Sequence, residues 1–123
     1  MRMPEPDQSV LAARDTLIAS LQSIVAEEGV IWSENQLKAY ESDGLTAYRQ
    51  LPLVVVLPED TRQVSEILKI CSEHRAKVVP RGAGTSLSGG ALPLADGVLL
   101  GLGKFNRILE IDYENRCAVV QPG

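Results

Sequence analysis

The order of apolar runs in residues 53–79 constrains the fold more than any other part of the sequence. Leu53 to Leu57 form an aliphatic run that is apolar on both faces, which is typical of a strand buried on both sides of a sheet. Asp60 or Thr61 can then cap a helix, and a second strand follows over residues 77–79. The helix is marked by an apolar stripe at i, i+3, i+4 and i+7: Val64, Ile67, Leu68 and Cys71. The pattern predicts a β-α-β unit of near-minimal length, with the two strands as a parallel pair and a right-handed crossover.

Helical patterns precede this unit. Apolar residues recur at helical spacing over residues 8–28, and Gly29 follows as the expected C-terminal stop of that helix. Ser33, with Gln36 three residues later, is a capping-box pattern that predicts a short helix toward Tyr40. Trp32 lies between the two predicted helices, and we expect it in the core.

Strand patterns follow the unit. Residues 98–100 form a third aliphatic run, and two alternating segments, 109–113 and 117–120, flank a turn signal and predict a hairpin. The sequence therefore predicts an α+β fold with α/β character. We expect an N-terminal helical segment over residues 1–52 and a second domain over residues 53–123.

Charge and hydropathy argue against several classes of protein. The net charge of -4 argues against a nucleic-acid-binding protein that depends on phosphate contacts. No apolar run approaches the roughly 18 residues that a membrane-spanning helix needs. Residues 1–8 lack the apolar core of a secretory signal, and we expect a cytoplasmic protein.

The sequence predicts no metal site and no catalytic histidine. Cys71 and Cys117 form no C-x-x-C motif and no Cys/His cluster. We expect two free thiols, with a disulfide between them as the less favoured alternative. His74 is the sole histidine, and its place at the end of a predicted helix favours a capping role over that of a general base.

A glycine-rich segment directly follows the strand at 77–79. Seven of the ten glycines lie between Gly82 and Gly103. Glycine permits positive φ angles and close approach of the backbone, and successive N–H groups in such a loop can form a concave nest for an anion. Arg81 adds positive charge at the start of the loop, and hydroxyl donors come from Thr85, Ser86 and Ser88. These residues predict a diphosphate site.

The loop matches neither of two familiar phosphate-binding motifs. Residues 84–89 have the glycine spacing of a P-loop, but Gly90 and Ala91 stand where lysine and serine or threonine are required. The dinucleotide-binding fingerprint begins at Gly82, but Leu87 occupies its third glycine position. A nucleotide hydrolase and a nicotinamide enzyme are therefore both disfavoured.

The alternative to a binding site is a plain glycine-rich turn. The loop runs about 16 residues from Arg81 to Gly97, whereas hairpin turns use about two to five. Loops of that length within compact domains are usually functional or disordered. The length and the polar content together favour a binding loop.

The run PRGAGTSLSGGALPL, at residues 80–94, resembles the pyrophosphate loop of the FAD-linked oxidases of the vanillyl-alcohol-oxidase type, also called PCMH-type flavoproteins. Three other segments resemble the FAD-binding subunits of bacterial glycolate oxidases within that family. They are YESDGLTAYR at residues 40–49, the run at 53–58 and AVVQPG at 118–123. The resemblance implies that the chain holds the first subdomain of a PCMH-type FAD-binding domain.

The resemblance also implies which residues hold the cofactor. Pro80 sets the start of the loop, the backbone amides that follow bind the FAD pyrophosphate, and two later glycines lie against the cofactor. Carried over to this sequence, the binding residues are Arg81, Gly82, Ala83, Gly84, Thr85, Ser86, Gly89 and Gly90. Some relatives attach flavin covalently through a histidine at the position of Thr85, which cannot form that bond. We therefore expect non-covalent FAD.

The implied activity is that of an FAD-dependent 2-hydroxy-acid oxidoreductase acting on a substrate such as glycolate. D-lactate and D-2-hydroxyglutarate dehydrogenases share the loop and remain alternatives, as does a binding module for a phosphate-bearing ligand without redox chemistry. In the family, the base and the substrate-binding residues lie in the C-terminal half, so we expect the catalytic residues beyond residue 123. The chain is then an N-terminal fragment, inactive alone.

The resemblance also suggests partners and a location. Family members work with an iron–sulfur subunit and with a second flavoprotein-like subunit of the same complex. Such partners could hold the protein at the inner membrane from the cytoplasmic side. Two residues of the 40–49 segment, Asp43 and Arg49, either help to close the flavin site or form a salt-bridged surface turn.

Overall fold

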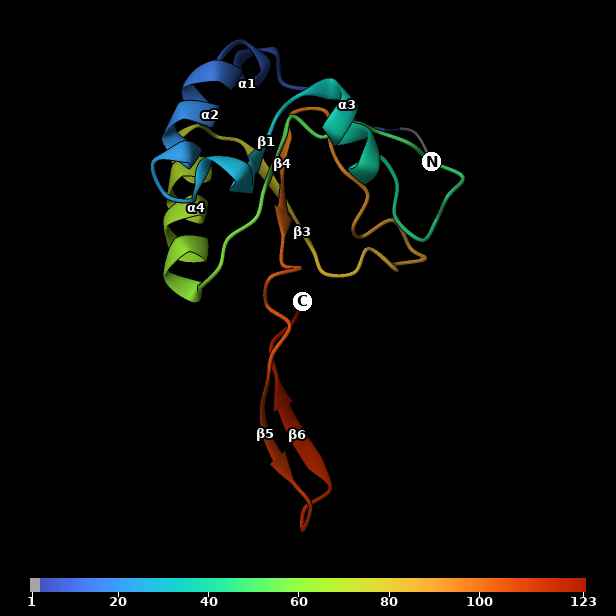
Figure 1. The fold of residues 1–123 in the computed structure, drawn as a ribbon. Helices are drawn as coiled ribbons and strands as arrows, with labels where there is room; N and C mark the ends of the chain where they lie inside the picture. The colour runs from blue at the N-terminus through green and yellow to red at the C-terminus, as the bar shows by residue number, and fades with distance from the viewer. Residues whose placement is uncertain (1–2) are drawn as a thin grey trace.

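The computed structural model describes residues 3–123 and contains a four-stranded sheet with helices on both faces (Figure 1). The strands lie in the order β1-β2-β4-β3. β1 runs antiparallel to β2, whereas β2, β4 and β3 are parallel. The strands are β1 (Val30–Ile31), β2 (Val54–Val56), β3 (Lys77–Arg81) and β4 (Gly97–Gly101). The helices are α1 (Gln8–Ala12), α2 (Arg14–Gln22), α3 (Glu34–Leu37) and α4 (Thr61–Glu73), with 3-10 turns η1 (Glu27–Gly29) and η2 (Lys38–Tyr40). The predicted α+β fold class is confirmed.

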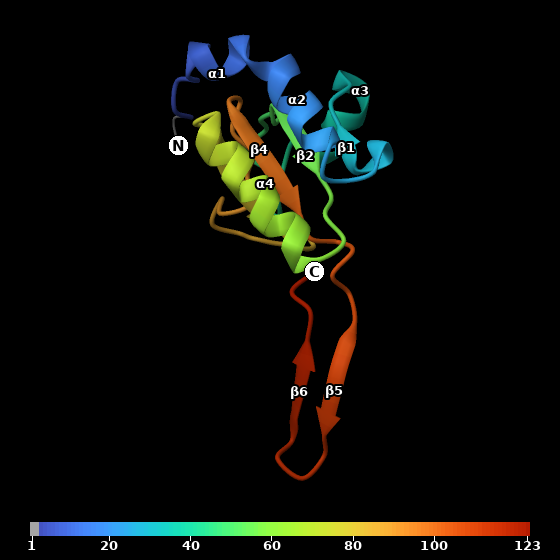
Figure 2. The ribbon, with the colours of Figure 1, turned by 90° about the vertical axis from the view of Figure 1, so that its left-hand side faces the viewer.

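Each face of the sheet carries its own apolar cluster. α1, α2 and α4 cover one face, where they pack on Val54, Val56 and Val98 (Figure 2). α3 lies on the other face, where Leu37 packs with Val55 and Leu99. All three residues of β2 are fully buried. The prediction of a strand apolar on both sides is therefore confirmed.

The β-α-β unit has the expected elements but not the expected pairing. Asp60 caps α4 by accepting a hydrogen bond from the Gln63 N–H at 2.8 Å. β2 and β3 are parallel but do not pair, because β4 lies between them. All five residues of β4 are buried, which suits the central position, and Pro80 lacks the N–H that a central strand would need. The predicted direct pair is therefore wrong, and β3 takes the edge of the sheet.

The predicted helix over residues 8–28 is shorter and broken. α1 and α2 meet at Ala13, and α2 ends at Gln22 rather than near Gly29. The Ser23 hydroxyl donates to the Ser20 carbonyl at 2.6 Å, a local bond that competes with further helix. Gly29 instead lies buried in η1, where a Cβ would stand 3.4 Å from the Leu57 carbonyl oxygen.

The connection that follows departs from the prediction in two respects. α3 and η2 confirm the short helix toward Tyr40, but the predicted capping box is not formed: Ser33 makes no side-chain cap hydrogen bond, and its hydroxyl donates instead to Gln36 Oε1. Trp32 is 49% exposed, so its predicted place in the core is wrong. The residue directly follows β1, a two-residue strand at the edge of the sheet, where one flank of the backbone has no neighbouring strand.

The predicted hairpin is present as β5 (Ile108–Asp112) and β6 (Cys117–Val120), and it extends away from the body of the fold (Figures 1 and 2). Its turn is held by the Asp112 carboxylate, which accepts from the Asn115 N–H at 3.0 Å. The apolar side chains of both strands are exposed, Ile108 by 65% and Val120 by 58%. The domain boundary at residue 52 stays a prediction.

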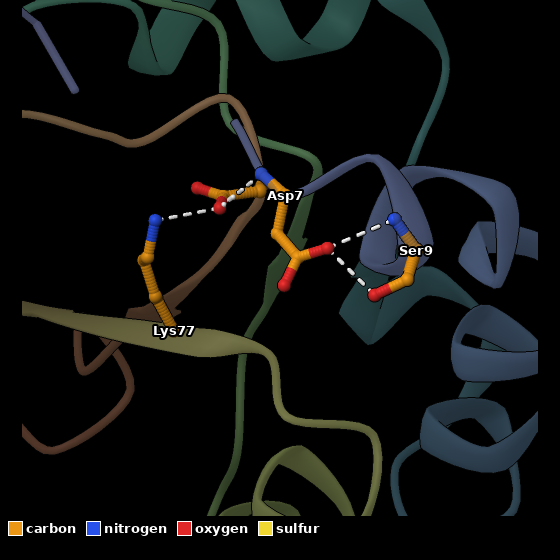
Figure 3. A network of polar contacts seen from close by, with 4 residues as sticks. Asp7, Ser9 and Lys77 are labelled. Atoms are coloured by element: carbon orange, nitrogen blue, oxygen red, sulfur yellow. Dashed lines mark hydrogen bonds and ion pairs between the residues drawn. The ribbon is translucent and has the colours of Figure 1, made fainter. Parts of the chain in front are cut away.

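A buried carboxylate joins three distant segments (Figure 3). Asp96 is 2% exposed, and its Oδ2 accepts from Lys77 Nζ at 2.6 Å and from the Asp7 N–H at 2.9 Å. The Asp7 side chain in turn caps α1 by accepting from the Ser9 N–H at 2.9 Å. Asp96 directly precedes β4. It therefore ties the start of α1 and the start of β3 to the start of β4.

We expect Asp96→Ala to lower the free energy of unfolding by about 1–2 kcal/mol, measured by urea denaturation. Two donors lose their shared acceptor, but Lys77 is partly exposed and regains water, which limits the loss. The control is Glu66→Gln, which removes an exposed i,i+4 ion pair with Arg62 and should change stability by less than about 0.5 kcal/mol. Equal effects of the two substitutions would contradict the assigned role of Asp96.

The same substitution has an expected pH dependence. Burial by itself raises the pKa of the Asp96 carboxyl, but the hydrogen bonds from Lys77 and from the Asp7 N–H outweigh it and hold the pKa below its ordinary value. A carboxyl whose folded-state pKa is lowered stabilises the fold above its unfolded-state pKa. That contribution is lost as the pH falls through the folded-state pKa. The stability difference between wild type and Asp96→Ala should therefore shrink in acid and be largest near neutral pH.

No helix within residues 3–123 is long and apolar enough to cross a bilayer.

Candidate flavin-binding site

The glycine loop begins where β3 ends, at the edge of the sheet that holds the carboxyl ends of three parallel strands. Ligands of open α/β sheets bind at this edge. A pocket of about 190 Å³ lies here, between the start of the glycine loop and the residues that follow β4. Its lining comprises Tyr40, Leu57, Arg81, Gly82, Gly101, Gly103 and Lys104.

The loop offers unpaired backbone donors. Within residues 3–123, the N–H groups of residues 83–87 donate to no acceptor. Gly84 has φ of 73° and Gly89 has φ of 76°, left-handed conformations that residues with a Cβ rarely adopt. Free N–H groups around a left-handed glycine are the components of an anion-binding nest. The loop therefore has the components of an anion nest, and its assignment to a pyrophosphate stays a prediction.

The Arg81 side chain connects the glycine loop to residues 40–42. Its Nη1 donates to the Ser42 carbonyl at 2.8 Å and to the Tyr40 carbonyl at 3.3 Å, and its guanidinium lies 5.9 Å from the centre of the Tyr40 ring. The guanidinium also passes under Gly84, where a Cβ would collide with it. The predicted role of Arg81 as positive charge for the ligand stays a prediction, and the structure adds that its Nη1 donates to residues 40 and 42.

Residues 40–44 pack against the glycine loop. Gly44 lies so close that a Cβ would stand 2.8 Å from the Ser86 carbonyl oxygen and 2.9 Å from that of Thr85. Asp43, beside it, is 5% exposed. Arg49 lies apart from this contact and pairs with Glu41 at 3.1 Å in an exposed position. The structure thus assigns Arg49 to a surface ion pair, whereas Asp43 is buried next to the residue that contacts the loop.

The sequence did not predict that residues at and after the end of β4 line one side of the pocket. Gly101 pairs with Arg81 in the sheet, and Lys104 lines the pocket while its Nζ contacts Glu59 Oε1 at 2.6 Å. The C-terminal end of the hairpin also returns here, and the Gly123 N–H donates to the Phe105 carbonyl at 2.8 Å. The available signal was the glycine that follows the third aliphatic run, since carboxyl ends of parallel strands meet at one edge.

The thiols and the histidine lie outside this site. Both cysteines are free, as predicted, with Cys71 buried and Cys117 exposed. Burial raises the pKa of the Cys71 thiol to about 11, which leaves it protonated and unreactive. His74 caps the C-terminal end of α4, which confirms the capping prediction. No group of three or more potential metal ligands occurs within the described part of the chain.

Comparison with known proteins gives matches over most of the chain. Residues 52–123 match the family model described as an FAD binding domain. Glycolate oxidase subunit GlcD of Escherichia coli K12 is 47% identical over 110 residues, which are 89% of this chain and 22% of that protein. The mitochondrial D-2-hydroxyglutarate dehydrogenase of Arabidopsis thaliana is 32% identical over 121 residues, covering 92% of this chain and 22% of that protein.

Among solved structures, p-cresol methylhydroxylase with substrate bound matches with a TM-score of 0.72. The match covers 98% of this chain and 24% of that one at 22% identity, and it confirms the predicted PCMH-type fold. The chain thus spans about a fifth of the length of the curated relatives it matches. Because the family model matches more than half of its length, this chain belongs to the FAD-binding domain family, as its glycine loop predicted.

Proposed function

We propose that this chain supplies the pyrophosphate-binding part of the FAD site of a 2-hydroxy-acid oxidoreductase, most similar to the FAD subunit of glycolate oxidase. The observation that carries the proposal is that the N–H groups of residues 83–87, at the carboxyl edge of a parallel sheet, have no acceptor among the described residues 3–123. The 47% identity to glycolate oxidase subunit GlcD supports the choice of reaction class.

In this proposal each part of the loop has a distinct task. The N–H groups of residues 83–87 and the hydroxyls of Thr85 and Ser86 hold the pyrophosphate. The conformations of Gly84 and Gly89 give the loop its concave shape, and Gly82 and Gly90 leave room for close approach. Pro80 and Arg81 fix where the loop leaves β3. Bound FAD supplies the two-electron acceptor for oxidation of the substrate, and this chain's residues bind and orient it.

The substrate class and the partners follow from the relatives. Glycolate is the proposed substrate, and the D-2-hydroxyglutarate dehydrogenase at 32% identity makes that acid a second candidate, with D-lactate as a third. The name of the GlcD relative describes it as a subunit, which supports a complex. That the other members are an iron–sulfur subunit and a second flavoprotein-like subunit is part of the proposal. Cytoplasmic location and catalytic residues beyond residue 123 belong to the same proposal.

The test uses the polypeptide that contains residues 1–123 together with the catalytic part proposed to follow them, called the full-length polypeptide below. It is purified with added FAD and desalted, and its retained FAD is measured. We expect the visible absorption bands of oxidised flavin to stay with the protein and to bleach on addition of glycolate without oxygen. If only D-2-hydroxyglutarate or only D-lactate bleaches the flavin, that acid and not glycolate is the substrate. Retention of another phosphate-bearing ligand in place of flavin would favour the alternative, a binding module without redox chemistry.

We also expect the flavin to be held without a covalent bond. Thr85 stands where some relatives carry the histidine that attaches flavin, and its hydroxyl is no substitute for that imidazole. Acid precipitation of the loaded protein should therefore leave all flavin fluorescence in the supernatant. Flavin that remains in the washed pellet would contradict this prediction.

A further inference from the structure

A buried acceptor without a donor lies where residues 40–44 meet the glycine loop. The Oδ1 atom of Asp43 accepts a hydrogen bond from the Leu45 N–H at 2.9 Å. Its Oδ2 is buried and has no hydrogen-bond partner within residues 3–123. An unpaired buried acceptor is costly, and a charged one more so, so such an atom in a folded protein calls for a donor from outside the chain.

Contacts on both sides place this carboxylate beside the loop. The preceding residue, Ser42, accepts from Arg81 Nη1 at 2.8 Å. The following residue, Gly44, lies against the carbonyl groups of Thr85 and Ser86. Asp43 therefore lies between two contacts, one with Arg81 at the start of the loop and one with Thr85 and Ser86, which the proposed function assigns to the FAD pyrophosphate.

We propose that Asp43 is an FAD-binding residue whose Oδ2 accepts a hydrogen bond from a sugar-type hydroxyl of the cofactor. An ionised phosphate offers no donor and repels a carboxylate. The groups that flank the pyrophosphate of FAD are the ribityl chain and the adenosine ribose, and both carry hydroxyls. A carboxylate that accepts from a ribose hydroxyl is a recurring arrangement in dinucleotide sites. The inference rests on the proposed function and adds a ligand contact outside the glycine loop.

The test isolates Oδ2 with Asp43→Asn in the full-length polypeptide. Asparagine keeps Oδ1 as the acceptor for the Leu45 N–H and replaces Oδ2 by a donor. We expect FAD to bind about tenfold more weakly, measured by quenching of flavin fluorescence. The apoprotein should melt at an unchanged or higher temperature, because Oδ2 has no hydrogen bond there that the substitution could remove. The matched control is Glu34→Gln, an exposed carboxylate of α3 that pairs with Lys38 outside the proposed site, which should leave the affinity unchanged.

FAD analogues that each lack one hydroxyl distinguish the ribityl chain from the ribose. The analogue that lacks the contacted hydroxyl should bind wild type about tenfold more weakly, with no further loss in Asp43→Asn. Unchanged FAD affinity in Asp43→Asn would overturn the inference while leaving the proposed function intact. So would a parallel loss of affinity and apoprotein melting temperature, which indicates a structural role. Wild-type protein that retains no FAD would instead overturn the proposed function, and the inference with it.

Discussion

Gly84→Val is expected to weaken FAD binding by at least about a hundredfold in the full-length polypeptide. Gly84 has φ of 73°, and a β-branched residue in the left-handed region costs roughly 1–2 kcal/mol. A Cβ at this position also collides with the Arg81 guanidinium, which would have to leave the carbonyl groups that it holds. Both effects change the direction of the N–H groups at residues 83–87, and an anion nest depends on that direction. Equilibrium titration followed by flavin fluorescence measures the loss.

The matched control is Ser88→Ala, in the same loop but outside the residues assigned to FAD. Ser88 is exposed, and alanine keeps the N–H that donates to Ser86 Oγ at 3.4 Å. We expect its FAD affinity to stay within about threefold of wild type. Far-ultraviolet circular dichroism of the apoprotein should show both variants folded, because the loop lies outside the core. Wild-type FAD affinity in Gly84→Val would refute the nest as the binding element.

The sequence predicted those parts of the fold that local pattern determines. The aliphatic run at β2 and the stripe of α4 gave the type and position of both elements, because burial on both faces and helical periodicity leave few alternatives. The hairpin of β5 and β6 was predictable from alternation and a turn signal. In each case the residues concerned are close in the sequence.

The errors arose where distant residues compete. Which strand is central depends on comparing β3, which contains Pro80, with the fully buried β4, and neither pattern alone reveals that comparison. The break between α1 and α2 is accompanied by tertiary contacts of Arg14, which donates to the carbonyl of Leu53 at 3.3 Å. Helical spacing over residues 8–28 carries no information about that partner.

The candidate site divides in the same way. The glycine loop was predictable because its composition is extreme and its conformation is local, with Gly84 and Gly89 in left-handed conformations. Sequence alone left open whether Asp43 lies in the site or on the surface, because its burial depends on Gly44 packing against a segment some forty residues later. The contacts of the Arg81 guanidinium with the Tyr40 and Ser42 carbonyls also join distant residues and were not predicted, whereas its role toward the ligand stays a prediction.

Arg81→Lys is expected to weaken FAD binding nearly as much as Arg81→Ala, by about tenfold to a hundredfold for each variant. Lysine keeps the positive charge but lacks the planar group that donates to the carbonyls of Tyr40 and Ser42 while lying near the Tyr40 ring. If Arg81 acts by holding residues 40–44 against the loop, the geometry of its donors matters more than its charge. The apoprotein variants should also become more sensitive to proteolysis within residues 41–50, because that segment loses its anchor.

Salt dependence separates this positioning role from direct charge pairing with the cofactor. An arginine that pairs directly with the pyrophosphate would be partly replaced by lysine, and the affinity that it contributes would fall with rising ionic strength. An arginine that donates to the Tyr40 and Ser42 carbonyls has uncharged partners, and added salt screens such contacts little. The ratio of wild-type to Arg81→Lys affinity should therefore be the same at low and high salt. A ratio that collapses toward one at high salt would show that the charge of Arg81 acts on the ligand. The cradle for the pyrophosphate would then consist of the nest and a cation together.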